Sequence, residues 1–181
     1  MKHTIITASV IVIILVISGY YFLTRDVPTG LFDEFPLNIS TTEAKRESPE
    51  GWSEYRSERY IFSLFYPEGM TVKEFDEGGG ASTFIFENVE KGLGFQIFVV
   101  PYGGTQIAED RFLKDVPSGI RENLSGLYLD GVLATSFDSK SIELGDTWEV
   151  WFIHKGLLYE MTTFRGQKTW LSEIIKTWRF I

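Results

Sequence analysis

The spacing of hydrophobic and polar positions divides the chain into two regions. Residues 4–23 are uncharged, whereas from residue 55 onward short apolar runs alternate with polar residues and turn signals. Alternation with a period of two is typical of β-strands. The run YIFSLFY (60–66) is apolar on both faces and predicts a central strand that is covered on both sides. Pro67 should end it because proline has no N–H to donate.

The same pattern predicts a series of antiparallel strands. Residues 71–77 and 82–88 should form a hairpin through three glycines, and residues 94–100 should form the next strand. Strand signals continue on either side of Gly131, within residues 126–139. The strongest hairpin signal is residues 147–154 and 157–164, which are joined by Lys155 and Gly156.

Three segments carry helical signals. Residues 105–116 place Ala108, Phe112 and Val116 four apart, with Thr105 as N-cap, and residues 118–124 read as a second short helical piece. A last helix is predicted by an apolar stripe, which consists of Trp170, Leu171, Ile174, Ile175 and Trp178. Strands joined by short turns, with helices inserted, predict an α+β fold: an antiparallel β-sheet flanked by helices, or α-β-α sandwich.

The uncharged segment at residues 4–23 predicts a transmembrane helix. A helix of about 20 residues spans roughly 30 Å, the hydrocarbon thickness of a bilayer. Lys2 and His3 precede the segment, and Arg25 and Asp26 follow it. This charge bias favours a cytoplasmic N-terminus. We therefore expect a single-pass membrane protein with an extracytoplasmic C-terminal domain. A cleaved signal peptide is the alternative.

These patterns predict three parts: an anchor at residues 1–23, a tether at 24–54 and an α+β domain at 55–181. The later half of the tether is polar and has no periodicity. Its earlier half contains the apolar residues Leu31, Phe32, Phe35 and Leu37. We interpret that half as a juxtamembrane segment lying at the membrane interface or docking on the domain. A partner-binding peptide is the alternative interpretation.

The charge of the chain argues against two classes of ligand. The formal net charge is −8, with 25 acidic and 17 basic residues. Nucleic acids and anionic lipid headgroups are bound through basic patches, so we expect no nucleic-acid partner. There are no cysteines. The exported domain must therefore be held together by its core, without disulfides.

The sequence offers little catalytic or metal-binding chemistry. His154 is the one histidine of the predicted domain, and we interpret it as a turn residue. Without cysteines, one histidine cannot make the usual nitrogen and sulfur zinc site. The acidic loops at residues 75–80 and 138–146 lack the ligand spacing of a known calcium loop. We expect no catalytic residue, no metal and no cofactor.

Two aromatic residues are candidates for a partner-binding patch. Trp151 and Phe164 fall on the faces opposite the best apolar stripes of their strands. Under a covering helix both would belong to the core. Left uncovered, they would form an exposed patch of the kind that marks interaction sites.

The order of the pieces resembles the PsbP-like family, whose fold is shared with Mog-type Ran-binding proteins. The similar segments are FSLFYPEG (62–69), FIFEN (84–88), FQIFVVPY (95–102), a helix near DVP (115–117), the hairpin at 148–164 and the ending IIKTWRF (174–180). The resemblance covers the domain from residue 55 to 181. It implies an α-β-α sandwich that usually serves as a binding or accessory module, and it assigns no active site.

Three functions are compatible with these observations. The first is a membrane-anchored, extracytoplasmic binding or accessory module that contacts an envelope protein and performs no catalysis. The second is an extracytoplasmic carboxylate-based hydrolase, which would need two acids converging in a cleft. The third is a binder of a small apolar ligand, which would need a void of a few hundred Å³ between sheet and helix.

Overall fold

The computed structural model describes residues 46–141 and 144–181. The predicted anchor and the predicted tether up to residue 45 lie outside the described residues. The strands are β1 (Trp52–Ser57), β2 (Phe62–Pro67), β3 (Thr71–Gly78), β4 (Ala81–Asn88), β5 (Leu93–Pro101), β6 (Glu122–Leu129), β7 (Val132–Ser141), β8 (Gly145–His154), β9 (Leu157–Phe164) and β10 (Arg179–Phe180). The helices are α2 (Glu109–Asp115), the 3-10 turn η1 (Arg165–Gln167) and α3 (Lys168–Ile175).

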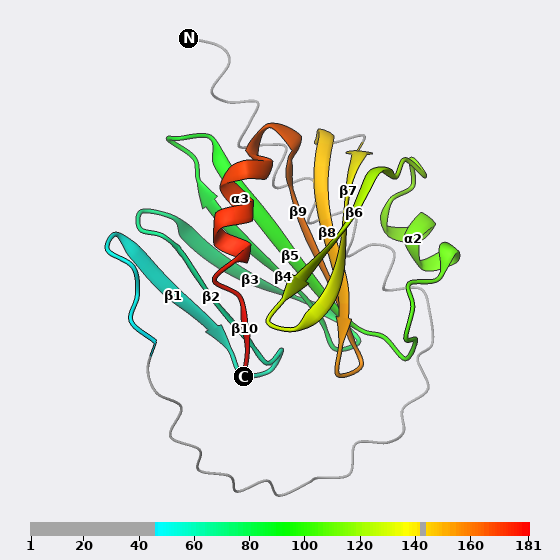
Figure 1. Ribbon diagram of the computed structural model, residues 1–181, viewed down its shortest axis with the longest axis horizontal. Coiled ribbons are helices and arrows are strands. Elements are labelled where there is room, and N and C mark those ends of the chain that lie inside the picture. The colour runs from blue at the N-terminus through cyan, green and yellow to red at the C-terminus, as the bar shows by residue number, and fades with distance from the viewer. Residues whose placement is uncertain (1–45, 142–143) are drawn as a thin grey trace, which may run out of the picture.

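The strands form two antiparallel sheets. The larger sheet has seven strands in the order β3-β4-β5-β9-β8-β7-β6, and the smaller has the order β1-β2-β10 (Figure 1). In the larger sheet, β9 pairs with both β5 and β8, so the strong β8–β9 hairpin lies at its centre. The two edge strands of this sheet are β3 and β6.

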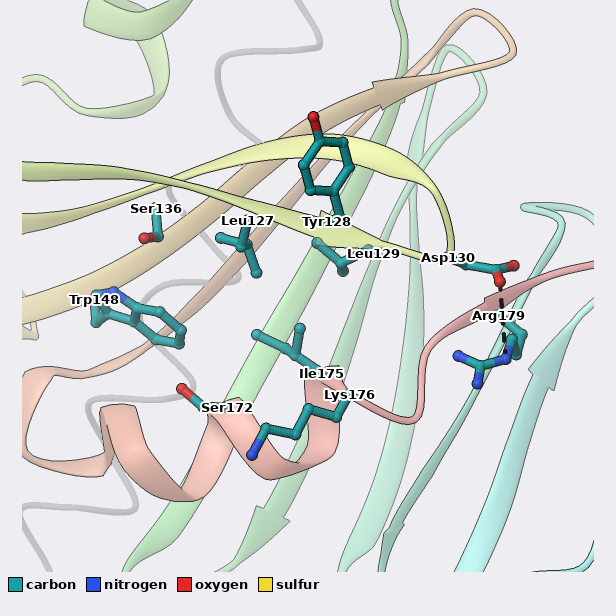
Figure 2. Close-up of a pocket in the computed structure, with 10 residues that line it drawn as sticks. All are labelled: Leu127, Tyr128, Leu129, Asp130, Ser136, Trp148, Ser172, Ile175, Lys176 and Arg179. Carbon is teal, nitrogen blue, oxygen red and sulfur yellow. Dashed lines mark ion pairs between the residues drawn. The ribbon is translucent and has the colours of Figure 1, made fainter.

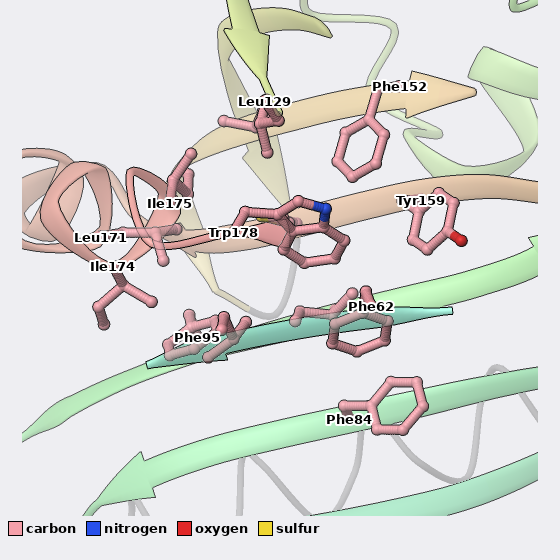
Figure 3. Close-up of a cluster of buried hydrophobic side chains, with 14 of the residues drawn as sticks. Phe62, Phe84, Phe95, Leu129, Phe152, Tyr159, Leu171, Ile174, Ile175 and Trp178 are labelled. Atoms are coloured by element: carbon pink, nitrogen blue, oxygen red, sulfur yellow. The ribbon is translucent and has the colours of Figure 1, made fainter. Parts of the chain in front are cut away.

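The main core fills one face of the larger sheet. Helix α3 and the smaller sheet cover this face together, and Trp148, Val150 and Phe152 of β8 point into it. Figure 3 shows Trp178 at its centre, among rings from both sheets. Because successive side chains of a strand point to opposite faces, Trp151 must lie on the other side.

Helix α2 covers part of the opposite face. Its Phe112 packs against Phe137 of β7 and Trp151 of β8, and Val116 completes this second cluster. The ring centroids of Phe112 and Trp151 are 5.8 Å apart. The domain is therefore mostly antiparallel sheet, with a short helix against each face of the larger sheet.

Most of the predicted strands are confirmed. The segments predicted at 71–77, 82–88 and 94–100 are β3, β4 and β5, and residues 126–139 fall in the β6–β7 hairpin. The hairpin around Lys155 and Gly156 is β8–β9. The smaller sheet was not predicted, and it covers much of the face expected to be covered by helix alone.

The helical predictions are confirmed only in part. Helix α2 begins at Glu109, and the residue before it is Ala108 rather than the predicted Thr105. The helical piece predicted at residues 118–124 is wrong, because β6 begins at Glu122. Helix α3 ends at Ile175, so Trp178 lies beyond it, directly before β10.

The described structure includes residues before Tyr55, the predicted start of the domain. Strand β1 starts at Trp52, and Arg46 donates hydrogen bonds to the Thr177 carbonyl at 2.7 Å and to Ser63 Oγ at 2.8 Å. Across residues 46–141 and 144–181, no helix is long and apolar enough to cross a membrane.

Candidate functional site

A pocket opens between the edge strand β6 and helix α3. Its volume is about 460 Å³. Leu127 and Leu129 of β6 form one wall, and Ser172 and Ile175 of α3 form the opposite wall (Figure 2). The pocket is open to solvent on one side and continuous with the main core on the other, since Leu129 and Ile175 belong to that core.

The floor of the pocket is aromatic. Trp148 of β8 lies beneath it, with Ser136 of β7 beside it. The Trp148 side chain is buried, and its indole Nε1 has no hydrogen-bond acceptor among the described residues. The ammonium group of Lys168 lies 5.4 Å from the centre of the Trp148 ring, within the range of a cation–π contact.

The mouth of the pocket carries charges of both signs. Lys176 and Arg179 line it, together with Asp130. The Arg179 Nε lies 3.8 Å from the Asp130 carboxylate, and the Lys176 Nζ lies 2.6 Å from the Glu173 carboxylate. The immediate lining therefore has two cations and one anion, in a chain whose net charge is −8.

A tight turn positions the β6 wall. Asp130 and Gly131 have positive φ values of 45° and 83° and join Leu129 to Val132, which is typical of a type I′ hairpin. The Asp130 carboxylate also accepts a hydrogen bond from the Phe180 N–H at 3.0 Å. The turn is thus tied to the C-terminal strand next to α3, and this contact fixes one end of the pocket.

A second group of polar residues lies under α2. Arg111 of α2 contacts the Asp115 carboxylate one turn later and donates to Glu160 of β9 at 3.1 Å. All three side chains are at least four-fifths buried. Burial raises the pKa of Glu160 well above its usual range, and the neighbouring Asp115 carboxylate raises it further. Burial also raises the pKa of Asp115.

Glu149 is buried on the same face of the sheet. Its carboxylate accepts hydrogen bonds from the Thr162 hydroxyl at 2.6 Å and from the Trp151 indole N–H at 3.4 Å. Burial raises the pKa of Glu149 above its usual range. The structure thus brings Glu149, Glu160 and Asp115 to the face covered by α2.

These acids are engaged within the fold and do not form an open reaction site. Catalytic carboxylates must reach a bound substrate. Asp115 and Glu160 are instead engaged by Arg111, and Glu149 by Thr162 and Trp151. No group of three or more acidic or histidine residues among the described residues is arranged to hold a metal ion.

Replacing Glu149 with glutamine is expected to stabilise the protein at neutral pH. The folded state holds the Glu149 proton more tightly than the unfolded chain does. This contribution to stability is therefore complete below the ordinary pKa of 4.5 and is lost as the pH rises through the raised folded value. Glutamine still accepts the Thr162 hydrogen bond and carries no charge. Urea unfolding at about pH 4 and about pH 7 should show the gain mainly at the higher pH.

The exposed Glu68 provides the control for this experiment. Glu68→Gln should leave stability unchanged at both pH values, since its carboxyl group is already in solvent. Equal stability of Glu149→Gln and the unaltered protein near pH 7 would contradict the assignment of Glu149 as a buried acid with a raised pKa.

The structure separates the two aromatic residues predicted as a partner-binding patch. Trp151 is only 2% exposed because Phe112 and Phe137 cover it, so it belongs to the core. Phe164 is 37% exposed at the end of β9. The predicted pair therefore does not form a patch. Other exposed apolar side chains lie elsewhere, among them Leu124 and Tyr128 of β6.

His154 occupies the position that the sequence predicts, at the end of β8 before the Lys155 turn. Its ring stacks on Phe180, with centroids 3.8 Å apart. Burial and the positive charge of Lys155 lower the pKa of His154. The hydrogen bonds and ion pairs of the described residues place no nucleophile beside it.

Sequence reasoning missed both the β6–α3 pocket and the acids under α2. For the acids there was a signal. Glu149 and Glu160 each stand between apolar or aromatic neighbours in a strand, and such a position in a central strand indicates a buried, partnered carboxylate. The pocket had no comparable signal, because its walls come from strands and a helix that are distant in the sequence.

Comparisons with known proteins show the fold. No protein-family model matches the chain, and no curated protein has a significantly similar sequence. The structure is similar to the solution structure of cyanobacterial PsbP (CyanoP) from Synechocystis sp. PCC 6803, with a TM-score of 0.51 and 14% identity. The match covers 81% of this chain and all of that one. The domain thus has a PsbP-like fold, which confirms the predicted resemblance. At this identity the similarity shows the fold alone.

Proposed function

We propose that the protein is a non-catalytic binding or accessory module that acts through contact with a partner protein. The β6–α3 pocket carries this proposal, since it is an open site with apolar walls at a sheet edge. The buried carboxylates are engaged by Arg111, Thr162 and Trp151, which disfavours the hydrolase alternative. PsbP-like folds typically serve as non-catalytic modules, which agrees with this proposal.

The proposed module is attached to a membrane and faces away from the cytoplasm. The support comes from residues 4–23, whose length and lack of charge suit a membrane-spanning helix, and from Lys2 and His3 before them. The partner would then be a protein of the cell envelope.

A small apolar ligand is the second candidate. A pocket of about 460 Å³ falls within the size range of ligand sites, and it lies between sheet and helix. The charges at its mouth and the sheet edge beside it suit a peptide better, because an apolar ligand would leave both unused.

Crosslinking in intact cells or spheroplasts tests the proposal. An amine-reactive crosslinker that cannot cross membranes is expected to join the full-length chain to one envelope protein, because Lys176 beside the pocket has a largely exposed side chain. Mass spectrometry would identify the joined protein and the lysines involved.

Two outcomes would count against the proposal in different ways. Crosslinks that form only after lysis would place the domain in the cytoplasm and overturn the orientation. A chain that acquires no protein adduct before or after lysis, while its lysines react with a monofunctional reagent, would overturn the binding-module function.

A further inference from the structure

We propose that the groove between β6 and α3 binds an extended segment of the partner protein, which adds a strand to the open edge at β6 and places an apolar side chain in the pocket. This inference rests on the proposed function and names the surface that would perform it. Addition of a strand to a sheet edge is a common mode of peptide recognition, in which main-chain hydrogen bonds supply affinity and pockets supply specificity.

The two edges of the larger sheet differ in the way this proposal requires. Edge strands are usually protected by charged side chains. The β3 edge has that protection, from Lys73, Glu74, Asp76 and Glu77. The β6 edge has no charged residue between Glu122 and Asp130. Charged side chains therefore oppose the pairing of a further strand with β3, whereas most of β6 has no such protection.

The backbone of β6 has groups available for pairing. The residues that flank a two-residue turn form a hydrogen-bonded pair, and such pairs alternate along an antiparallel ladder. Leu129 and Leu127 therefore bond to β7, which leaves the N–H and C=O groups of Gly126 and Tyr128 directed to the open edge. Among the described residues, no further strand pairs with β6.

The pocket lies directly beside these backbone groups. The Tyr128 ring points away from α3 in Figure 2, whereas Leu127 points toward Ile175 and Trp148. Tyr128 thus borders the pocket through its backbone. A strand paired with β6 would direct alternate side chains into the pocket and across the opposite face, where Leu124 and Tyr128 are 58% and 74% exposed.

The charges indicate an acidic residue in the bound segment. Lys176 and Arg179 line the mouth, and Lys168 lies over the Trp148 ring of the floor. Arg179 pairs with Asp130 and Lys176 pairs with Glu173, which leaves one cation more than carboxylates among these residues. The groove thus has an excess of positive charge, and an aspartate or glutamate beside the apolar anchor would complement it.

A second copy of this chain fits the edge less well. Antiparallel pairing of two β6 strands that sets Leu124 opposite Tyr128 also sets Glu122 opposite Asp130 at both ends. Like charges placed opposite each other destabilise a strand pair. The net charge of −8 adds to this repulsion. A segment of another protein is therefore the better occupant.

Selection from random dodecapeptides displayed on phage tests the groove directly, with the full-length protein as the target. We expect enriched peptides with apolar residues at alternate positions and a neighbouring aspartate or glutamate. A synthetic copy of an enriched peptide should slow amide exchange at Gly126 and Tyr128. In a strand paired with β6, only every second residue of the peptide directs its N–H group toward β6. Methylation of those backbone nitrogens should abolish binding, and methylation of the backbone nitrogens between them should not.

Two matched variants locate the binding surface. Ser172→Trp fills the pocket from the α3 side and should weaken peptide binding by about tenfold or more. Glu173→Trp adds the same side chain at the next residue, which does not line the pocket. It also removes the carboxylate that pairs with Lys176, so this variant should bind an acidic peptide at least as tightly as the unaltered protein does. Both positions lie on the surface of α3, so circular dichroism should show that both variants are folded.

The remaining outcomes would overturn the inference. Self-association that Ser172→Trp abolishes would make a second copy the occupant. If a synthetic peptide of residues 29–38 binds to the groove, the occupant would be a segment of this chain and not of another protein. If an envelope protein crosslinks to Lys73 or Lys91, and Ser172→Trp leaves that crosslink intact, the proposed function stands and the groove is the wrong surface.

Discussion

Replacing Trp178 with alanine is expected to lower the free energy of unfolding by about 3–5 kcal/mol, and replacing Phe62 with alanine by a similar amount. Both side chains are fully buried, and their rings stack with centroids 4.5 Å apart and an interplanar angle of 7°. Trp178 also contacts Phe152 and Tyr159 edge to face, at 5.3 and 5.8 Å (Figure 3). Removing either ring therefore leaves a large cavity between the two sheets.

Urea unfolding of the full-length protein measures this effect. A domain of this size has a total stability of only about 5–15 kcal/mol, so either change should shift the midpoint strongly. His154→Ala is the comparison. It removes a partly exposed ring stacked on Phe180, and its expected loss is less than about 1 kcal/mol. Unchanged midpoints for Trp178→Ala and Phe62→Ala would contradict the assignment of these rings to the core.

The strands were predictable because period-two alternation and short apolar runs both report burial directly. In β2, Phe62, Ser63, Leu64 and Phe65 are all buried, as apolar residues on both faces of this segment predict. The β8–β9 hairpin was equally clear, since Lys155 and Gly156 adopt the positive φ values that a two-residue turn needs. These features depend on residues close together in the sequence.

The helix boundaries were less predictable because distant residues fix them. Helix α2 begins at Glu109, after a loop held by Tyr102, whose hydroxyl accepts the Ala108 N–H at 2.9 Å and donates to the Gln106 carbonyl at 2.8 Å. These bonds take the place of the predicted Thr105 cap. Trp178 follows the helical period of α3 but lies beyond its end, and β10 has only two residues, too few to show a pattern.

The candidate site depends on pairing between distant strands and could not be read from local patterns. Trp151 was compatible with either core or surface, and the position of α2 decided for the core. The walls of the pocket come together because the β6–β7 hairpin turns at Asp130, which contacts Arg179 after α3. A contact between residues so far apart in the sequence leaves no periodic signal.

The second large effect is expected from Arg111→Met, which should destabilise the protein by about 3–5 kcal/mol near neutral pH. Methionine keeps much of the arginine side-chain volume but removes the charge that Asp115 and Glu160 share. Glu160 is then left buried without its cation, and Asp115 keeps only the attraction of Lys114. Because Arg111 joins α2 to β9, the loss should also release α2 from the sheet and expose Trp151, which a red shift of tryptophan fluorescence would report.

The dependence on pH and a rescue variant separate lost charge pairing from lost packing. Burial raises the pKa values of Glu160 and Asp115 in the folded state. As the pH falls toward the ordinary pKa values, both acids therefore become protonated in the folded protein before they do in the unfolded chain. The loss of stability caused by Arg111→Met should then become smaller. Adding Glu160→Gln and Asp115→Asn to Arg111→Met should restore much of the stability near neutral pH, since a buried ionic group replaced entirely by neutral residues is often tolerated.

Arg165→Met is the control. It breaks the half-exposed pair with Asp146 and should cost less than about 1 kcal/mol. If Arg111→Met costs no more than Arg165→Met at any pH, the buried acids do not depend on Arg111, and α2 is held to the sheet by the apolar contacts of Phe112 and Val116.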